Sequence, residues 1–478
     1  MSEPKKTESF AGNVMKYSIA TYLGFGISGA ALIIKGVLPA ESYAVPASFM
    51  AYTMSLMNVG MLGLDQSLLR FYHEPPAGST GRSMFAACTR LSVLVMLLVG
   101  GIGSIFFAKP LAAAFGLGAN GAGLVPFLFL NAALYMLVRY LNVLLRLENN
   151  ERAYTTEPLW MQACVVTQDA RAFELWAVGS FAGVAVFYWR RAAKGQTKEA
   201  PVRGLRPYAH IYRAALPYGI VLAPAAILIP LYRAICLSFL GNYAPAAEQG
   251  SFDFAYTLAQ LVTTIQAGFS TYWGPYVYAH YRTEQERIGR IHDLLNLLIF
   301  GFFCLLVMFE DIIFIIFPAK SACLPYFPLM MLAVVFSILC EGTVYGNTIA
   351  RKPFQDTIGT AVGVAANIAV CAVLVPRFGV MGAAVGLVAA NATMFLYRTV
   401  TGQYYYRTIP SFSRTICGFL LAVGVAVIGV VFAHNFIIKF VLTAAILFIY
   451  CNIYRAQLYK LWQIFMGFVR RYLLHSQA

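Results

Sequence analysis

Residues 289–317 read GRIHDLLNLLIFGFFCLLVMFEDIIFIIF, a nearly unbroken apolar stretch between charged connectors. A helix that crosses the hydrocarbon core of a bilayer needs roughly 20 apolar residues. The backbone groups of such a segment must be paired within it, which favours helices over sheets. Similar stretches recur along the chain, so the sequence predicts an all-α, polytopic membrane protein.

The composition and the distribution of charge agree with this fold class. Apolar residues make up 60% of the chain and charged residues 12%, whereas soluble domains carry about 25% charged residues. The net charge is +15, and most of the Lys and Arg residues fall in alternate connectors. This is the positive-inside pattern, which places the basic side and both termini in the cytoplasm. We expect a multi-pass protein of the cell inner membrane that contacts anionic lipids and binds no nucleic acid.

The apolar stretches predict where the helices cross. The expected spans are residues 14–36, 45–69, 83–107, 122–147, 173–189, 209–238, 249–276, 289–317, 324–350, 354–375, 379–401, 411–433 and 436–453. Both ends of the segment 153–190 are basic, so an even number of crossings must lie between them. Either two short crossings or a re-entrant hairpin satisfies this condition.

A basic, Gly- and Pro-containing connector at 191–208 divides the chain. We expect an N-terminal helical lobe at 1–190 and a C-terminal helical lobe at 209–405, followed by two additional spans within 406–453. The tail, 454–478, mixes basic and aromatic residues at near-helical spacing, which is typical of an amphipathic helix on the cytoplasmic membrane surface.

No pattern in the sequence indicates catalysis. There is no P-loop, no GxSxG motif and no metal-ligand spacing, and the nine cysteines form no CxxC pair. His73, His210, His280 and His292 all lie in or beside expected cytoplasmic connectors, so we expect them to be solvated. The sequence therefore predicts no catalytic residue, no metal and no cofactor, and it favours a protein that is not an enzyme.

The candidate functional residues are the charges inside spans, because each costs roughly 2.5–3.5 kcal/mol on insertion scales. Their depths suggest two groups. Asp65, Arg70 and Arg139 belong to the inner half of the membrane, and Arg233 and Asp253 lie near its outer side.

The two groups have two possible roles. Arg binds phosphate oxygens bidentately, so a cavity lined by Arg139 and Arg233 would hold an anionic headgroup, with Glu341 as a further inner-half candidate. Alternatively, each group is a structural ion pair between helices.

Two further patterns concern helix geometry. Pro217, Pro224 and Pro230 fall within one span and predict either a helix that bends during transport or static kinks. The small residues of GVMGAAVGLVAAN, 379–391, indicate close helix packing.

Five stretches together resemble the O-antigen and polysaccharide flippases of the multidrug/oligosaccharidyl-lipid/polysaccharide exporter superfamily. They are GLDQSLLRFY (63–72), ALPY (215–218), LYRAICLSFLG (231–241), FDFAYTLAQLVTTIQAGFSTYWGPYVY (252–278) and PRFGVMGAAVGLVAANATMFLYRTVTGQYYYR (376–407). Such flippases usually have Asp-Arg where this chain has Tyr232-Arg233, so Asp253 would replace the missing counter-ion.

The resemblance implies about 14 transmembrane helices, arranged as two six-helix lobes plus two C-terminal helices. It also implies a substrate, a lipid-linked oligosaccharide that is moved from the inner to the outer leaflet. A polysaccharide polymerase and glycosyltransferases would then be possible partners.

Two other functions compete with this one. A drug/cation antiporter of the same fold would need acidic cavity residues without isolated arginines. A membrane-embedded polysaccharide polymerase or ligase would need a large outer loop, but the longest expected outer connector is 108–123.

Overall fold

The computed structural model describes residues 32–33, 35–117, 121–147, 206–350, 352, 354–459 and 462–463, together with isolated residues between 179 and 190. Every regular element in these ranges is a helix. Within the described residues, eight helices are long and apolar enough to cross a membrane, or nine if the bent pair α2–α3 is one span. The predicted all-α, multi-pass fold class is therefore confirmed.

The chain divides into two compact units. The first comprises Met1–Gly268 and Pro353–Met394, and the second comprises Phe269–Lys352 and Phe395–Ala478. These units do not test the lobe boundaries expected from the sequence, which stay predictions. Three features lie outside the described residues: the choice between two crossings and a hairpin in 153–190, most of the expected span 14–36, and most of the tail.

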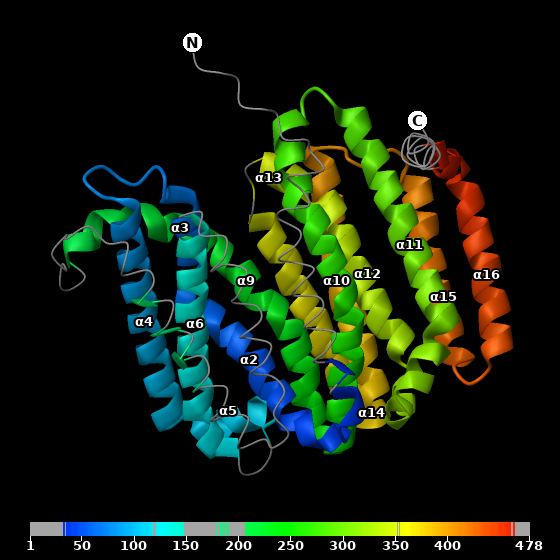
Figure 1. Cartoon of the computed structure of the whole chain (residues 1–478), viewed down its shortest axis with the longest axis horizontal. Coiled ribbons are helices and arrows are strands. Elements are labelled where there is room, and N and C mark those ends of the chain that lie inside the picture. The colour runs from blue at the N-terminus through cyan, green and yellow to red at the C-terminus, as the bar shows by residue number, and fades with distance from the viewer. Residues whose placement is uncertain are drawn as a thin grey trace, which may run out of the picture. The chain divides into compact units, whose positions relative to one another are not determined.

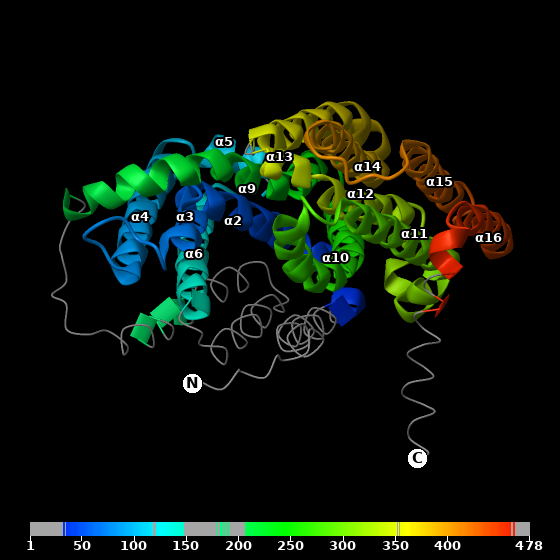
Figure 2. The same cartoon turned by 90° about the horizontal axis from the view of Figure 1, so that it is seen from above.

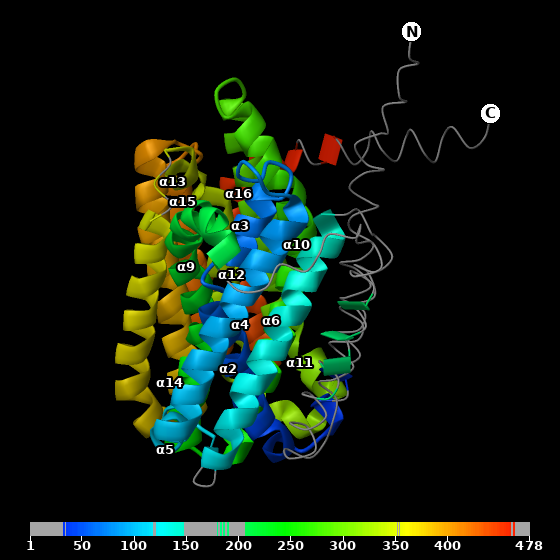
Figure 3. The same cartoon turned by 90° about the vertical axis from the view of Figure 1, so that its left-hand side faces the viewer.

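The first unit contains a group of packed helices. They are η1 (Ala40–Tyr43), α2 (Ala44–Met61), α3 (Leu64–Phe71), α4 (Gly81–Phe106), α5 (Ala108–Ala114), η2 (Gly121–Leu124), α6 (Val125–Leu147), η3 (Arg206–Tyr208) and α9 (Ala209–Tyr243). Helix α2 packs against α4, α6 and α9, and α3 packs against α9. Figures 1 and 3 show α4 and α6 side by side.

The second unit is built around α11. Its elements are α11 (Gln285–Ile316), η4 (Pro318–Cys323), α12 (Phe327–Thr343), α13 (Tyr345–Ile349), α15 (Phe412–Val431) and α16 (Phe436–Ile453). Helix α11 contacts α12, α15 and α16, and Figure 2 shows α11, α15 and α16 next to one another. Two long helices, α10 (Ala246–His280) and α14 (Phe354–Tyr405), contribute residues to both units.

Helix α14 is a hairpin of two helices. Gly379 has non-helical torsions, with φ 51° and ψ −127°, three residues after Pro376. A Cβ on Gly382 would lie 2.7 Å from the backbone nitrogen of Val375, and one on Gly386 would lie 3.0 Å from Oδ1 of Asn367. The two halves therefore run antiparallel in close contact. The structure thus has two helices where two spans are predicted, and the predicted small-residue packing face is confirmed.

The sequence predicted one unbroken helix at 45–69, and this prediction is wrong. The helix breaks between α2 and α3 with a bend of 57°. Leu62 and Gly63 adopt left-handed torsions, with φ 50° and 69°. The break fits against α9, where a Cβ on Gly63 would lie 2.8 Å from the carbonyl carbon of Gly219. Only a residue without a side chain allows this approach.

Helix α9 stays helical through its three prolines, and its ribbon changes direction along its length (Figure 1). Pro230 has no N–H, so the carbonyl of Ala226, four residues earlier, loses its helical partner. The side-chain amide of Asn58 on α2 donates a hydrogen bond to that carbonyl at 3.0 Å. A neighbouring helix thus supports the proline site.

We expect Asn58→Ala to destabilise the first unit, because the Ala226 carbonyl then lacks both its helical and its side-chain partner. An unsatisfied buried acceptor costs about 1–3 kcal/mol, which should lower the midpoint of thermal unfolding in detergent. Asn452→Ala is the matched control, since the exposed Asn452 only donates to Phe448 on its own helix. Equal midpoints for the two variants would contradict this account.

Candidate functional site

The outer candidates meet around a buried carboxylate in the first unit. Asp253, in the second turn of α10, is fully buried and forms ion pairs with Arg233 of α9 and with Nζ of Lys35, the latter at 2.8 Å. The Arg233 guanidinium also lies over the ring of Tyr256, 5.1 Å from its centroid. We call Lys35, Arg233, Asp253 and Tyr256 the Asp253 cluster.

The Asp253 cluster carries more positive than negative charge. Two cations, Arg233 and Lys35, face a single carboxylate. The side chains of these two cations are 20% and 15% exposed. The buried Nε of Arg233 has no hydrogen-bond partner among the described residues, so the guanidinium keeps a donor to spare. This arrangement can bind an anion.

The residue before Arg233 has a packing role. The Tyr232 hydroxyl donates to the backbone carbonyl of Thr360 at 3.0 Å, and the amide of Asn367 donates to the Tyr232 carbonyl at 2.8 Å. Tyr232 therefore joins α9 to the first half of α14. Asp253 pairs with Arg233 instead, and so takes the counter-ion role that the resemblance to the flippases implies.

The inner candidates are brought together only in part. Arg139 of α6 lies 3.6 Å from Asp65, whose carboxylate also accepts a hydrogen bond from Gln66 at 2.9 Å. Asp65 sits in the first turn of α3, where the helix dipole favours a negative charge. The Arg139 side chain is 45% exposed and remains open to a further partner. Arg70 instead forms an exposed pair with Glu74 at 3.1 Å, one turn along the chain.

Glu341 belongs to a different part of the fold. Its backbone lies near the end of α12, in the second unit, whereas the other five candidates belong to the first unit. The orientation of its side chain is outside the described part of the chain. A role for Glu341 in a substrate cavity stays a prediction.

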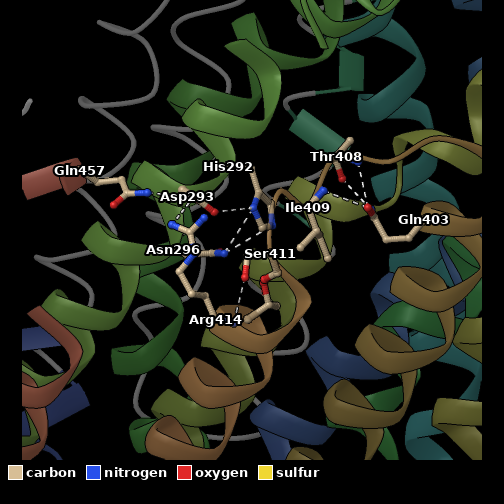
Figure 4. A network of polar contacts seen from close by, with 10 residues as sticks. His292, Asp293, Asn296, Gln403, Thr408, Ile409, Ser411, Arg414 and Gln457 are labelled. Carbon is tan, nitrogen blue, oxygen red and sulfur yellow. Dashed lines mark hydrogen bonds and ion pairs between the residues drawn. The ribbon is translucent and has the colours of Figure 1, made fainter. Parts of the chain in front are cut away.

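A polar network in the second unit was not expected (Figure 4). Asp293 of α11 is buried and pairs with Arg414 of α15 at 3.0 Å. It also accepts a hydrogen bond from Gln457, which follows α16, at 3.0 Å. His292 is 1% exposed beside it, so the expectation that this histidine is solvated is wrong.

The network borders a cavity of about 20 Å³, enough for one water molecule. Its lining includes polar groups of His292, Asn296 and Thr415 and the rings of Phe300, Tyr450 and Tyr454. The Tyr450 and Phe300 rings stack with centroids 3.8 Å apart. The cavity is too small for a sugar, so we regard this region as a structural connection among α11, α15 and α16.

Within the described residues, no group of three or more His, Cys, Asp or Glu side chains is close enough to hold a metal ion.

A third charged cluster in the second unit consists of Glu310, Asp311 and Lys439, and the sequence analysis did not predict it. The signal was present in the sequence, since Lys439 is a cation inside an apolar span.

Comparison with known proteins gives the class of the fold. No family model and no curated protein matches the chain. A solved structure of a lipid II flippase, MurJ, in an inward closed conformation matches with a TM-score of 0.68 over 92% of this chain and 99% of that chain, at 12% identity.

A second match is an inward-facing multidrug resistance MATE family transporter of the MOP superfamily. Its TM-score is 0.54 over 81% of this chain and 97% of that chain, at 14% identity. At these identities the similarity establishes the fold alone. The chain is a multi-pass membrane protein with the fold shared by MurJ and the MATE transporters.

Proposed function

We propose that this protein is a transporter that moves a polyprenyl-diphosphate-linked oligosaccharide from the inner to the outer leaflet of the cytoplasmic membrane. The product would serve the assembly of a surface polysaccharide such as O-antigen, capsule or exopolysaccharide. In this proposal the protein binds and reorients its substrate and makes no covalent bond.

The surplus positive charge of the Asp253 cluster is the observation that carries the proposal. A diphosphate is anionic, and the planar fork of a guanidinium matches phosphate oxygens bidentately. Asp253 would hold Arg233 in place while Arg233 and Lys35, whose side chains are 20% and 15% exposed, bind the headgroup. The fold, which is similar to that of a lipid II flippase over most of both chains, suits this role.

Arg139 is the second proposed contact. Its guanidinium is 45% exposed and only loosely paired, with 3.6 Å to Asp65, so a phosphate can compete for it. Two arginine sites predicted at different depths would hold the headgroup successively as the substrate crosses. Arg70 is not needed in this scheme, because it forms its own exposed pair with Glu74.

The ion pairs of the first unit argue against the antiporter alternative. A cationic drug requires a carboxylate that is not already neutralised, but Asp65 and Asp253 are each paired with arginine.

The polymerase or ligase alternative requires a catalytic outer segment. The longest expected outer connector contains the short helix α5 and lacks any recognisable catalytic motif.

Deleting the gene tests the proposed function against these alternatives. We expect surface polysaccharide to disappear while polyprenyl-diphosphate-linked units accumulate in the inner leaflet, as measured by lipid extraction and protection from an external glycosidase. Accumulation of unpolymerised units in the outer leaflet would instead identify a polymerase. An unchanged polysaccharide together with altered dye efflux would identify an antiporter.

A further inference from the structure

The second unit contains three charged side chains packed between α11 and α16. The Nζ atom of Lys439 lies 2.8 Å from Oε1 of Glu310 and 2.5 Å from Oδ2 of Asp311. The side chains of Lys439 and Glu310 are fully buried, and that of Asp311 is 22% exposed. Lys439 and Glu310 are thus removed from any solvent that could stabilise a net charge.

The charges of this cluster do not balance. If all three groups are ionised, one ammonium faces two carboxylates and the cluster carries one net negative charge. An uncompensated buried charge is strongly unfavourable, and a buried group usually becomes neutral instead. A single proton on one of the carboxylates would remove this net charge.

Burial indicates which carboxylate takes the proton, because the Glu310 side chain is fully buried and that of Asp311 is 22% exposed. Oε1 of Glu310 accepts from Lys439, but the buried Oε2 has no hydrogen-bond partner among the described residues. A proton on Oε2 would remove the charge from this unpartnered oxygen.

Among the described residues, the charged groups that act on Glu310 are Lys439 and Asp311. Lys320 follows on η4 and is the next cation along the chain. Arg414, the only charged residue of α15, pairs with Asp293 near the opposite end of α11. Glu341, the only charged residue of α12, belongs to that opposite end too, because Gly342 packs against His292.

We propose that Glu310 is a proton-binding site, with Asp311 and Lys439 as its ion-pair support. A metal cation fits poorly, because hard cations take six or more oxygen ligands and Lys439 already fills the space between the carboxylates. The site does not depend on the identity of the transported substrate.

Proton release has a mechanical consequence. It would leave one negative charge buried between α11 and α16, so the packing of these two helices is favoured when Glu310 is protonated and weakened as the pH rises. The proton on Glu310 thus controls how stably α16 packs against α11.

Infrared difference spectroscopy of the purified full-length protein in nanodiscs tests this site. We expect a carbonyl band of a protonated carboxylic acid at neutral pH, which shifts in D₂O, disappears at high pH and is absent in Glu310→Gln. Glu248→Gln is the matched control and should keep the band, because Glu248 has its own partner in the backbone N–H of Val380 at 3.1 Å. Glu310→Gln retains the Asp311–Lys439 pair and should therefore fold.

A band that persists in Glu310→Gln, or a wild-type protein without any such band across its folded pH range, would overturn the proposal. So would a band that responds to exchange of K⁺ for Na⁺ at constant pH, because that would indicate a sodium site.

Discussion

Asp253→Asn should abolish the accumulation of folded protein. The substitution removes the only carboxylate of the Asp253 cluster and leaves Arg233 and Lys35 without their counter-charge. Removing one partner of a buried ion pair costs about 3–5 kcal/mol, a large share of the roughly 5–15 kcal/mol by which folded proteins are stable. Size-exclusion chromatography in detergent and thermal unfolding measure the effect.

A charge-balanced variant separates folding from transport. Asp253→Asn combined with Arg233→Gln removes one charge of each sign, so the remaining Lys35, which is 15% exposed, no longer sits beside a second cation. We expect folding to recover and substrate translocation to stay lost. If Asp253→Asn alone folds as well as the wild type, the cluster is not the buried charge centre described here.

Gly63→Ala should strongly destabilise the first unit. The new Cβ would lie 2.8 Å from the carbonyl carbon of Gly219, and Gly63 has φ 69°, where alanine is strained. Backbone strain of this kind costs about 1–3 kcal/mol, and the contact would also separate α3 from α9. Since α3 carries Asp65, Arg139 would lose its partner as well.

Gly78→Ala is the matched control for this substitution. Gly78 also has a positive φ, 77°, but a Cβ there would meet nothing within 4 Å. The difference in unfolding midpoint between the two variants therefore measures the close approach of α3 and α9 alone. Similar midpoints would mean that the helix packing at Gly219 contributes little.

The sequence predicted the spans well because the bilayer imposes a length on each apolar segment. Helices α4, α6, α11, α15 and α16 begin and end within a few residues of their expected spans. The proximity of Arg233 and Asp253 was also predictable, since two charges at one depth on consecutive spans have few other partners.

The features that the sequence did not reveal depend on packing between distant segments. Lys35 lies 218 positions from Asp253, and nothing local indicates that they meet. The break at Leu62–Gly63 follows from close contact with Gly219, which hydropathy cannot detect. His292 looked solvated because it lies beside a charged connector, but Asn296 and the surrounding helices bury it.

Translocation by the purified protein is the most direct test of the central claim. Proteoliposomes would contain a fluorescent polyprenyl-diphosphate-linked oligosaccharide, and quenching from outside would report its movement between leaflets. We predict rapid translocation by the wild type, partial activity in Arg233→Lys, which keeps the charge without the fork, and none in the folded Asp253→Asn/Arg233→Gln variant. Wild-type rates in that double variant would contradict the claim that the Asp253 cluster holds the diphosphate.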